Sequence, residues 1–403
     1  MTPPQDRLSE YARLAVGFAL NLQAGQVVAV NALLEHAPLV RAIAREAYAA
    51  GATFVDVLYG DQHVRRAHIQ HAPEDALDWS PPWLVKRLDD LAEQGGALLA
   101  ISGNPEPELF ADLDGARVGR ARMRAVSEAS LRLTDGLCNW AIVACPNEGW
   151  ARTVFGEPDL DRLWDAVASA VRLDESDPIG AWRAHMRMLQ DRAAKLNAQR
   201  FDALRYRGPG TELTVGLHPD STWLAAADEV RGIDFVPNIP TEEVFTVPDA
   251  RRADGIVRAT YPLQIQGTIV RGLSVRFEGG RAVEVRADEG EELMRTYVAT
   301  DDGAAHLGEV ALVDGASRVG RSGIVFYDTL FDENAASHIA LGMAILQGID
   351  GAGALSPEDR RARGVNHSSI HTDFMIGSSE LDISGLDAAG GETPILRHGD
   401  WVL

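Results

Sequence analysis

Cysteine is scarce in this sequence: Cys138 and Cys145 are the only two among 403 residues. Their spacing forms neither a C-x-x-C pair nor a disulfide framework, which excludes a disulfide-stapled secreted protein and is typical of a reducing cytoplasm. Both lie in the apolar run Leu137 to Cys145, where free cysteine usually packs as a small hydrophobic residue. We therefore expect two buried structural thiols in a cytoplasmic protein.

Long hydrophobic runs are also missing. No apolar segment approaches the roughly 20 residues that a membrane-spanning helix needs. The chain does not open with a basic and then apolar leader. We therefore expect no membrane partner and no export.

Positive charge is in deficit, with 38 Lys and Arg residues against 59 Asp and Glu residues and a formal net charge of -21. An acidic protein repels the phosphate backbone, so nucleic acid is not expected as a ligand. The acidity favours solubility, and it also suits a cation site or a cationic substrate.

The first half of the chain alternates strand-like and helix-like segments. The predicted strands are Val27 to Val30, Phe54 to Leu58, Ala97 to Ile101 and Trp140 to Cys145. The predicted helices between them are Leu39 to Ala50, Pro82 to Gln94 and Arg117 to Leu133. Strands that alternate with helices of this length predict a parallel α/β sheet with right-handed crossovers.

After Phe201 the segments become short, alternate in polarity and are punctuated by glycine, with Gly279-Gly280 predicting a hairpin turn. A chain of this length is expected to form two domains. We therefore predict an α/β domain with a parallel sheet over residues 1–200. An α+β, β-rich domain that binds metal is predicted over residues 201–403.

Two carboxylate segments of the second domain are candidates for a site. Glu242 and Glu243 follow Pro240; in an extended segment their side chains point to opposite sides, so only one of them can face a given site. The run Leu307 to Val313 predicts a buried strand that carries Glu309. A buried carboxylate needs a partner, which a metal or an arginine can supply.

Two histidine segments complete the candidate site. Leu330 to Leu346 follows a helical period and predicts a helix, with Glu333 at its entrance and His338 five residues later. His371-Thr372-Asp373 predicts a strand on which the imidazole and the carboxylate project to the same face.

Carboxylates outnumber imidazoles in these four segments. So many oxygen donors exceed what one catalytic zinc takes, and they fit two divalent ions roughly 3.5 to 4 Å apart that share carboxylates. Zinc, cobalt, manganese and magnesium all stay open as the metal. The pattern therefore predicts a metal-assisted hydrolase.

The same stretches resemble the M29 family of metallo-aminopeptidases, the aminopeptidase T and aminopeptidase S group. They read PNIPTEEVFT from Pro237, LGEVALV from Leu307, DTLFDENAASHIALG from Asp328 and HTDFMIG from His371. The resemblance extends over essentially the whole chain. It implies metal ligands at Glu243, Glu309, Glu333, His338, His371 and Asp373.

The resemblance also implies an activity. It implies removal of N-terminal amino acids from peptides with a free N-terminus, by a water that two divalent metal ions activate. A homodimer that encloses its active sites is implied as well. Glu333 is expected to be either a ligand or the catalytic base, and the sequence does not separate the two roles.

One position departs from the family pattern. The family commonly has a tyrosine seven residues after the histidine that corresponds to His338, where this chain has Ile345. On a helix, that side chain would lie two turns from His338 and on nearly the same face. The departure leaves open a catalytically impaired homologue that binds peptide or metal. Separately, a two-metal site also leaves open a dinuclear phosphoesterase.

Overall fold

The computed structural model of the chain describes residues 5–225, 227–265 and 267–403. Its Cα packing divides the chain into two compact units. The first unit consists of Met1–Met186 and Ala226–Thr241, and the second of Arg187–Ala225 and Glu242–Leu403. These units describe compact packing and do not test the predicted domain division between residues 200 and 201, which stays a prediction.

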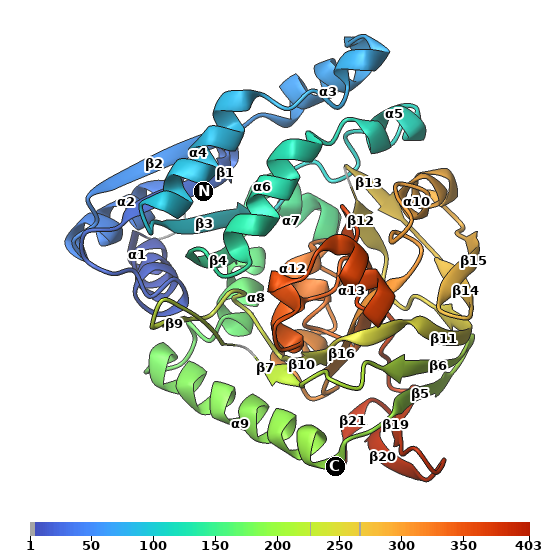
Figure 1. Ribbon diagram of the computed structural model, residues 1–403. Helices are drawn as coiled ribbons and strands as arrows, with labels where there is room; N and C mark the ends of the chain where they lie inside the picture. Colours follow the sequence, from blue (N-terminus) through green and yellow to red (C-terminus); the bar gives the residue numbers. More distant parts are fainter. Residues whose placement is uncertain (1–4, 226, 266) are drawn as a thin grey trace. The chain divides into compact units, whose positions relative to one another are not determined.

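A four-stranded parallel sheet forms the centre of the first unit, in the order β2-β1-β3-β4 (Figure 1). Its strands are β1 (Val27–Leu33), β2 (Phe54–Gly60), β3 (Ala97–Ser102) and β4 (Asn139–Ala144). The predicted parallel α/β sheet is thus confirmed in the N-terminal part of the chain.

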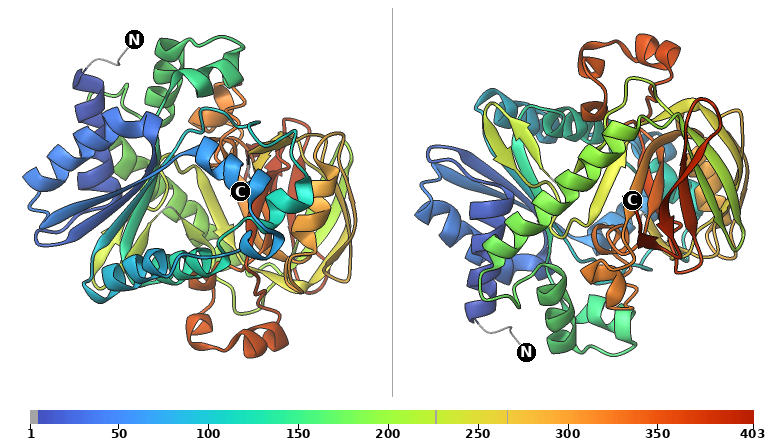
Figure 2. Two further views of the ribbon diagram at one scale, coloured as in Figure 1. Left: turned by 90° about the horizontal axis from the view of Figure 1, so that it is seen from above. Right: turned by 90° about the horizontal axis from the view of Figure 1, so that it is seen from below.

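Helices cover both faces of this sheet. Leu88 and Leu91 of α4 (Pro82–Glu93) and Leu133 of α6 (Arg124–Thr134) form one core cluster with Ala29 and Leu98 of the sheet. The helices α1 (Gln5–Arg13) and α2 (Ala37–Ala49) lie on the opposite side (Figure 2). Alternate residues of each strand therefore pack against different helices.

The predicted helix over Arg117 to Leu133 is wrong as a single element. The structure has α5 (Gly115–Arg120) and then α6, separated by a turn in which Met123 adopts a φ of 45°. A residue with positive φ cannot continue a right-handed helix, so the chain changes direction there.

The remaining elements of this half are mostly helical. They are η1 (Leu14–Ala19), η2 (Leu34–His36), α3 (Gln62–His71), η3 (Glu74–Ala76), α7 (Glu148–Phe155), α8 (Leu160–Ala170), α9 (Pro178–Gln199), β8 (Asp228–Val230) and β9 (Ile233–Phe235). None of the helices in the described ranges combines the length and the apolar character that crossing a bilayer requires.

The second unit is β-rich, as predicted, and its larger sheet has eight strands in the order β15-β14-β11-β6-β5-β19-β20-β21. Figure 1 shows β14, β11, β6 and β5 side by side. The strands are β5 (Ala203–Gly208), β6 (Thr211–Leu217), β11 (Pro248–Arg258), β14 (Ser274–Glu278), β15 (Arg281–Arg286), β19 (Asp382–Leu386), β20 (Glu392–Arg397) and β21 (Asp400–Trp401).

A smaller antiparallel sheet in the order β18-β17-β16-β10-β7 carries the predicted metal donors. Its strands are β7 (Leu224–Ala225), β10 (Glu243–Thr246), β16 (Leu307–Val313), β17 (His338–Gly342) and β18 (His371–Met375). Every residue of β16 and β17 is buried. Around the two sheets lie β12 (Leu263–Ile265), β13 (Thr268–Val270), α10 (Glu291–Val298), α11 (Arg318–Arg321), α12 (Thr329–Asp332), η4 (Leu346–Gly348), η5 (Ala352–Ala354) and α13 (Pro357–Arg363).

The predicted helix over Leu330 to Leu346 is wrong. Only the short α12 is helical, and the chain then extends into β17, with His338 as its first residue. β17 is an inner strand with both faces buried, and such strands are apolar throughout instead of alternating. A short apolar run of this kind cannot be distinguished from a buried helix by periodicity alone.

The predicted hairpin at Gly279 and Gly280 is confirmed between β14 and β15, and it offers a matched pair of substitutions. Both residues have positive φ, so Gly279→Ala is expected to cost about 1–2 kcal/mol. A Cβ at position 280 would also press against the carbonyl oxygen of Ala250, so Gly280→Ala should cost about 1–3 kcal/mol more. Thermal unfolding of the two variants measures the difference; equal melting temperatures would contradict this packing.

Candidate metal centre

The donor side chains gather on one face of the five-stranded sheet. Strand pairing places Glu309 of β16 opposite Ala340 of β17, and Ala340 opposite Asp373 of β18. Residues two apart on a strand share a face, so His338 lies on that face beside Ala340, and His371 lies there beside Asp373. The structure therefore brings the imidazole and the carboxylate of the β18 segment together, as the alternation predicted.

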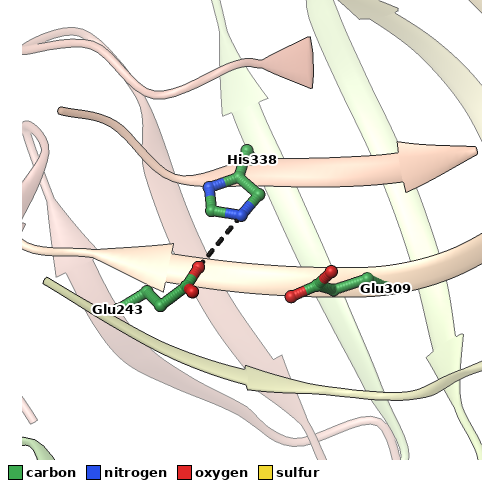
Figure 3. Close-up of side chains that lie close together, drawn as sticks. All are labelled: Glu243, Glu309 and His338. Atoms are coloured by element: carbon green, nitrogen blue, oxygen red, sulfur yellow. Dashed lines mark ion pairs between the residues drawn. The ribbon is translucent and has the colours of Figure 1, made fainter. Parts of the chain in front are cut away.

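Glu243 reaches the same face from β10. Phe245, two residues along β10, lies opposite Ala311, and Ala311 lies opposite His338. Glu243 therefore projects to the same face as His338. Figure 3 shows the His338 ring and the carboxylates of Glu243 and Glu309 pointing toward one another from three neighbouring strands.

The distances define two groups of donors. His338 Nε2 lies 3.0 Å from Glu243 Oε2, while His371 Nε2 lies 3.1 Å from Glu309 Oε2 and 3.4 Å from Asp373 Oδ1. Ligand atoms of Glu243, Glu309 and His338 lie within 4.8 Å of one another, and so do those of Glu309, His371 and Asp373. Glu309 belongs to both groups, which is the arrangement expected of a carboxylate shared by two sites.

Backbone carbonyls orient both imidazoles. Nδ1 of His338 lies 3.2 Å from the carbonyl oxygen of Ala336, and Nδ1 of His371 lies 2.8 Å from that of Met343. A ring whose Nδ1–H donates to a carbonyl presents its Nε2 lone pair on the other side, as metal-ligating histidines do. Both Nε2 atoms face carboxylate oxygens, and a cation between them would bind both partners.

The burial of two carboxylate oxygens also fits a bound cation. Glu243 Oε2 and Asp373 Oδ1 are buried oxygens that lie 3.0 and 3.4 Å from the Nε2 atoms of His338 and His371. When Nδ1 of a neutral ring carries the proton, its Nε2 has none to donate, and the facing carboxylate oxygen accepts no hydrogen bond from it. A buried charge without hydrogen bonds is costly, and coordination to a metal removes that cost. The donor set of imidazoles and carboxylates therefore fits divalent metal ions.

Burial and mutual repulsion perturb the titration of the group. Burial raises the pKa of Glu309 and raises that of Glu333 well above its ordinary value, and neighbouring carboxylates add to both shifts. Burial acts to lower the pKa of His338 and His371, but the carboxylates around them outweigh it and both imidazole pKa values lie well above the ordinary one. Without a cation, the group therefore retains protons that a metal would displace.

Glu333 occupies a different place from the other five donors. It is the C-cap residue of α12 and is buried. Its carboxylate interacts electrostatically with Asp373 and Glu243, but it belongs to neither group of converging ligand atoms. The structure thus places Glu333 beside the centre, on the short helix and not on the strand of His338.

Sequence reasoning missed Asn334, which positions the Glu243 strand. Asn334 is fully buried; its Oδ1 accepts the backbone N–H of Glu242 at 2.6 Å, and its Nδ2 donates to the carbonyl of Leu330 at 2.9 Å. The amide thereby ties the start of β10 to the end of α12. The polar run Asp332-Glu333-Asn334 was the available signal, since a buried amide in such a run needs partners for each of its groups.

Comparison with known proteins gives consistent matches. Residues 4–401 match the family model described as thermophilic metalloprotease (M29). The chain is 46% identical to aminopeptidase T of Thermus thermophilus, with 98% of each chain covered. It is 42% identical to aminopeptidase 2 of Geobacillus stearothermophilus, with 99% of this chain and 98% of the relative covered. The solved structure of wild-type AmpT from Thermus thermophilus superposes with a TM-score of 0.89 at 44% identity, covering 99% of this chain and 100% of the other.

The small side chain of Ala340 should be needed for cation binding, because it lies between Glu309 and Asp373 in one row of the sheet. In Ala340→Val, the added methyl groups occupy the space above that row, and metal affinity should fall about 10- to 100-fold. Ile339→Val alters the opposite face and should cost about 0.5–1.5 kcal/mol of stability without changing metal content. Elemental analysis and chelator competition measure both; unchanged affinity in Ala340→Val would place the cations elsewhere.

Proposed function

The chain belongs to the M29 family of metalloproteases and is an aminopeptidase, and on that premise we propose that its two donor groups bind two divalent cations that serve the hydrolysis. The observation that carries this proposal is the sharing of Glu309 between the two groups. Its substrates are peptides with a free N-terminus.

The proposed ligand set follows the two groups. One cation would be held by Glu243, Glu309 and His338, and the other by Glu309, His371 and Asp373. Each group contains one imidazole, which favours zinc, cobalt or manganese over magnesium. Bound cations supply Lewis acidity, which polarises the peptide carbonyl and lowers the pKa of the attacking water.

Glu333 is the proposed proton carrier. Its carboxylate is buried beside the centre, outside both groups of converging ligand atoms, and its pKa is raised well above the ordinary value. A carboxylate oxygen of Glu333 would take a proton from the attacking water and deliver it to the nitrogen of the leaving amine. A general base works best when its pKa lies near the operating pH, and burial moves Glu333 in that direction.

Negative charge around the centre explains the proposed requirement for a free N-terminus. The converging donors include the carboxylates of Glu243, Glu309 and Asp373, and Glu333 interacts with them electrostatically. A cationic α-ammonium group is attracted into such a field, whereas an N-acetyl group carries no charge to attract.

Cellular location and assembly are also part of the proposal. Cys138 and Cys145 are free and buried, and burial raises the pKa of each thiol to about 12. Unreactive free thiols support a reducing cytoplasm. We propose a homodimer as well, which sedimentation of the purified protein would establish.

The predicted position of Ile345, two helical turns after His338, is wrong. Ile345 is half-buried in the turn between β17 and η4, so it is not placed two helical turns after His338. The relatives are named aminopeptidases, which favours peptides over phosphoesters as substrates. The names of the relatives support an active peptidase over the impaired homologue and the phosphoesterase.

Substrate selectivity tests the activity directly. Peptides with a free N-terminus should release their first amino acid, and the same peptides should be inert once N-acetylated, because acetylation removes the ammonium charge. Chelation should abolish turnover, and adding back zinc, cobalt or manganese should restore it. Equal turnover of free and acetylated peptides would contradict recognition of the terminus.

Two carboxamide variants separate the base from the ligands. Glu333→Gln should keep both cations and lose about 10²- to 10⁴-fold in kcat, because it removes only the proton carrier. Glu309→Gln should lose cations and activity together, since Glu309 is common to both groups. Metal content and kcat are measured on the same samples; loss of metal in Glu333→Gln would make that residue a ligand instead.

A further inference from the structure

The strand that carries His371 and Asp373 is an edge of its sheet. β18 is the first strand in the order β18-β17-β16-β10-β7, so only one of its sides pairs with a strand of the described ranges. Edge strands present a row of backbone N–H and C=O groups that another extended chain can pair with. The edge of this sheet therefore borders the candidate metal centre.

The hydrogen bonds at both ends of β18 show which residues point outward. The N–H of Met343 donates to the carbonyl of Ile370 at 2.6 Å, and the N–H of Ile376 donates to the carbonyl of Ser337 at 2.9 Å. In an antiparallel pair the residues alternate between bonding the partner strand and facing away from it. The backbone groups of residues 370, 372, 374 and 376 therefore face β17, and those of 371, 373 and 375 face outward.

Among the described residues, the outward backbone groups of β18 have a backbone partner at one end only, at Met375. The carbonyl of Met375 accepts the N–H of Thr260 at 2.8 Å and its hydroxyl at 3.3 Å. Within the described residues, no other backbone segment pairs with this edge. The N–H and C=O of His371 and the C=O of Asp373 therefore point outward without a backbone partner among the described residues, while the N–H of Asp373 interacts with its own carboxylate.

Exposure increases toward the same edge. The side chain of His338 is 2% exposed and that of Glu309 5%, whereas Asp373 is 13% and His371 26% exposed. The donor group is closed on the side of the inner strands and opens at β18. A substrate that enters the centre would therefore pass this strand.

We propose that the peptide substrate binds by strand addition, with the backbone that follows the scissile bond pairing with the outward groups of His371 and Asp373. The inference rests on the proposed aminopeptidase function and specifies its substrate as an extended peptide. An added strand lies about 4.8 Å from β18, so a first residue that turns over the sheet face comes within reach of the donors. Backbone pairing is independent of side chains, so the downstream sequence matters little.

Strand addition makes a prediction with period two, because alternate residues of an added strand direct their N–H groups to β18. A tetrapeptide with a free N-terminus is compared with two analogues, in which an ester replaces either the second or the third peptide bond. Each ester removes one N–H and leaves the scissile bond intact. One ester should raise KM about 3- to 10-fold with kcat unchanged, and the other should match the parent peptide.

The outcomes separate the two claims. Equal KM values for the parent and both esters, with all three hydrolysed, would overturn strand addition and leave the aminopeptidase function standing. If the metal-loaded protein hydrolyses none of the peptides, the proposed function fails, and calorimetric Kd values for the same three peptides then test strand addition. The alternation in Kd would support it, and equal Kd values would overturn it.

Discussion

Repulsion between buried carboxylates is the constraint on which this site depends. Glu243, Glu309 and Asp373 are directed into one small volume, and two like charges about 4 Å apart repel by about 4 kcal/mol at an effective dielectric constant of about 20. The strands that carry them can stay in place only because their other face is anchored. Val310, Ile339 and Phe374 alternate with the donor-face residues and are fully buried. Cations would convert the repulsion into attraction, so metal binding and strand packing act on the same elements.

β17 organises the centre more than any other strand. It contributes His338, and the carbonyl groups that orient both imidazoles come from Ala336 before it and Met343 after it. Its donor face otherwise carries Ala340 and Gly342, which place no long side chain beside the donors. One inner strand thus supplies a donor and the orientation of two donors.

Much of this site was predictable because its pattern has period two. His371 and Asp373 are two residues apart on a strand, and Glu309 lies in an apolar run that could only be a buried segment. β17 was not predictable in the same way, because a strand buried on both faces shows no alternation, and its apolar run fits a helical period as well. The choice between Glu242 and Glu243 also lies beyond local sequence. It depends on the pairing of β10 with β16, which is a long-range property.

The order of strands connects the chemistry with access. Donors on inner strands are held by a neighbouring strand on each side, whereas donors on an edge strand lie next to unpaired backbone. Here His338 and Glu309 come from inner strands, while His371 and Asp373 come from the edge. The inner pair holds the donors in position, and the edge pair lies beside the backbone with which we propose that an extended peptide pairs. A sheet that placed β18 between two other strands could hold the same cations, but an extended peptide would find no unpaired backbone beside them.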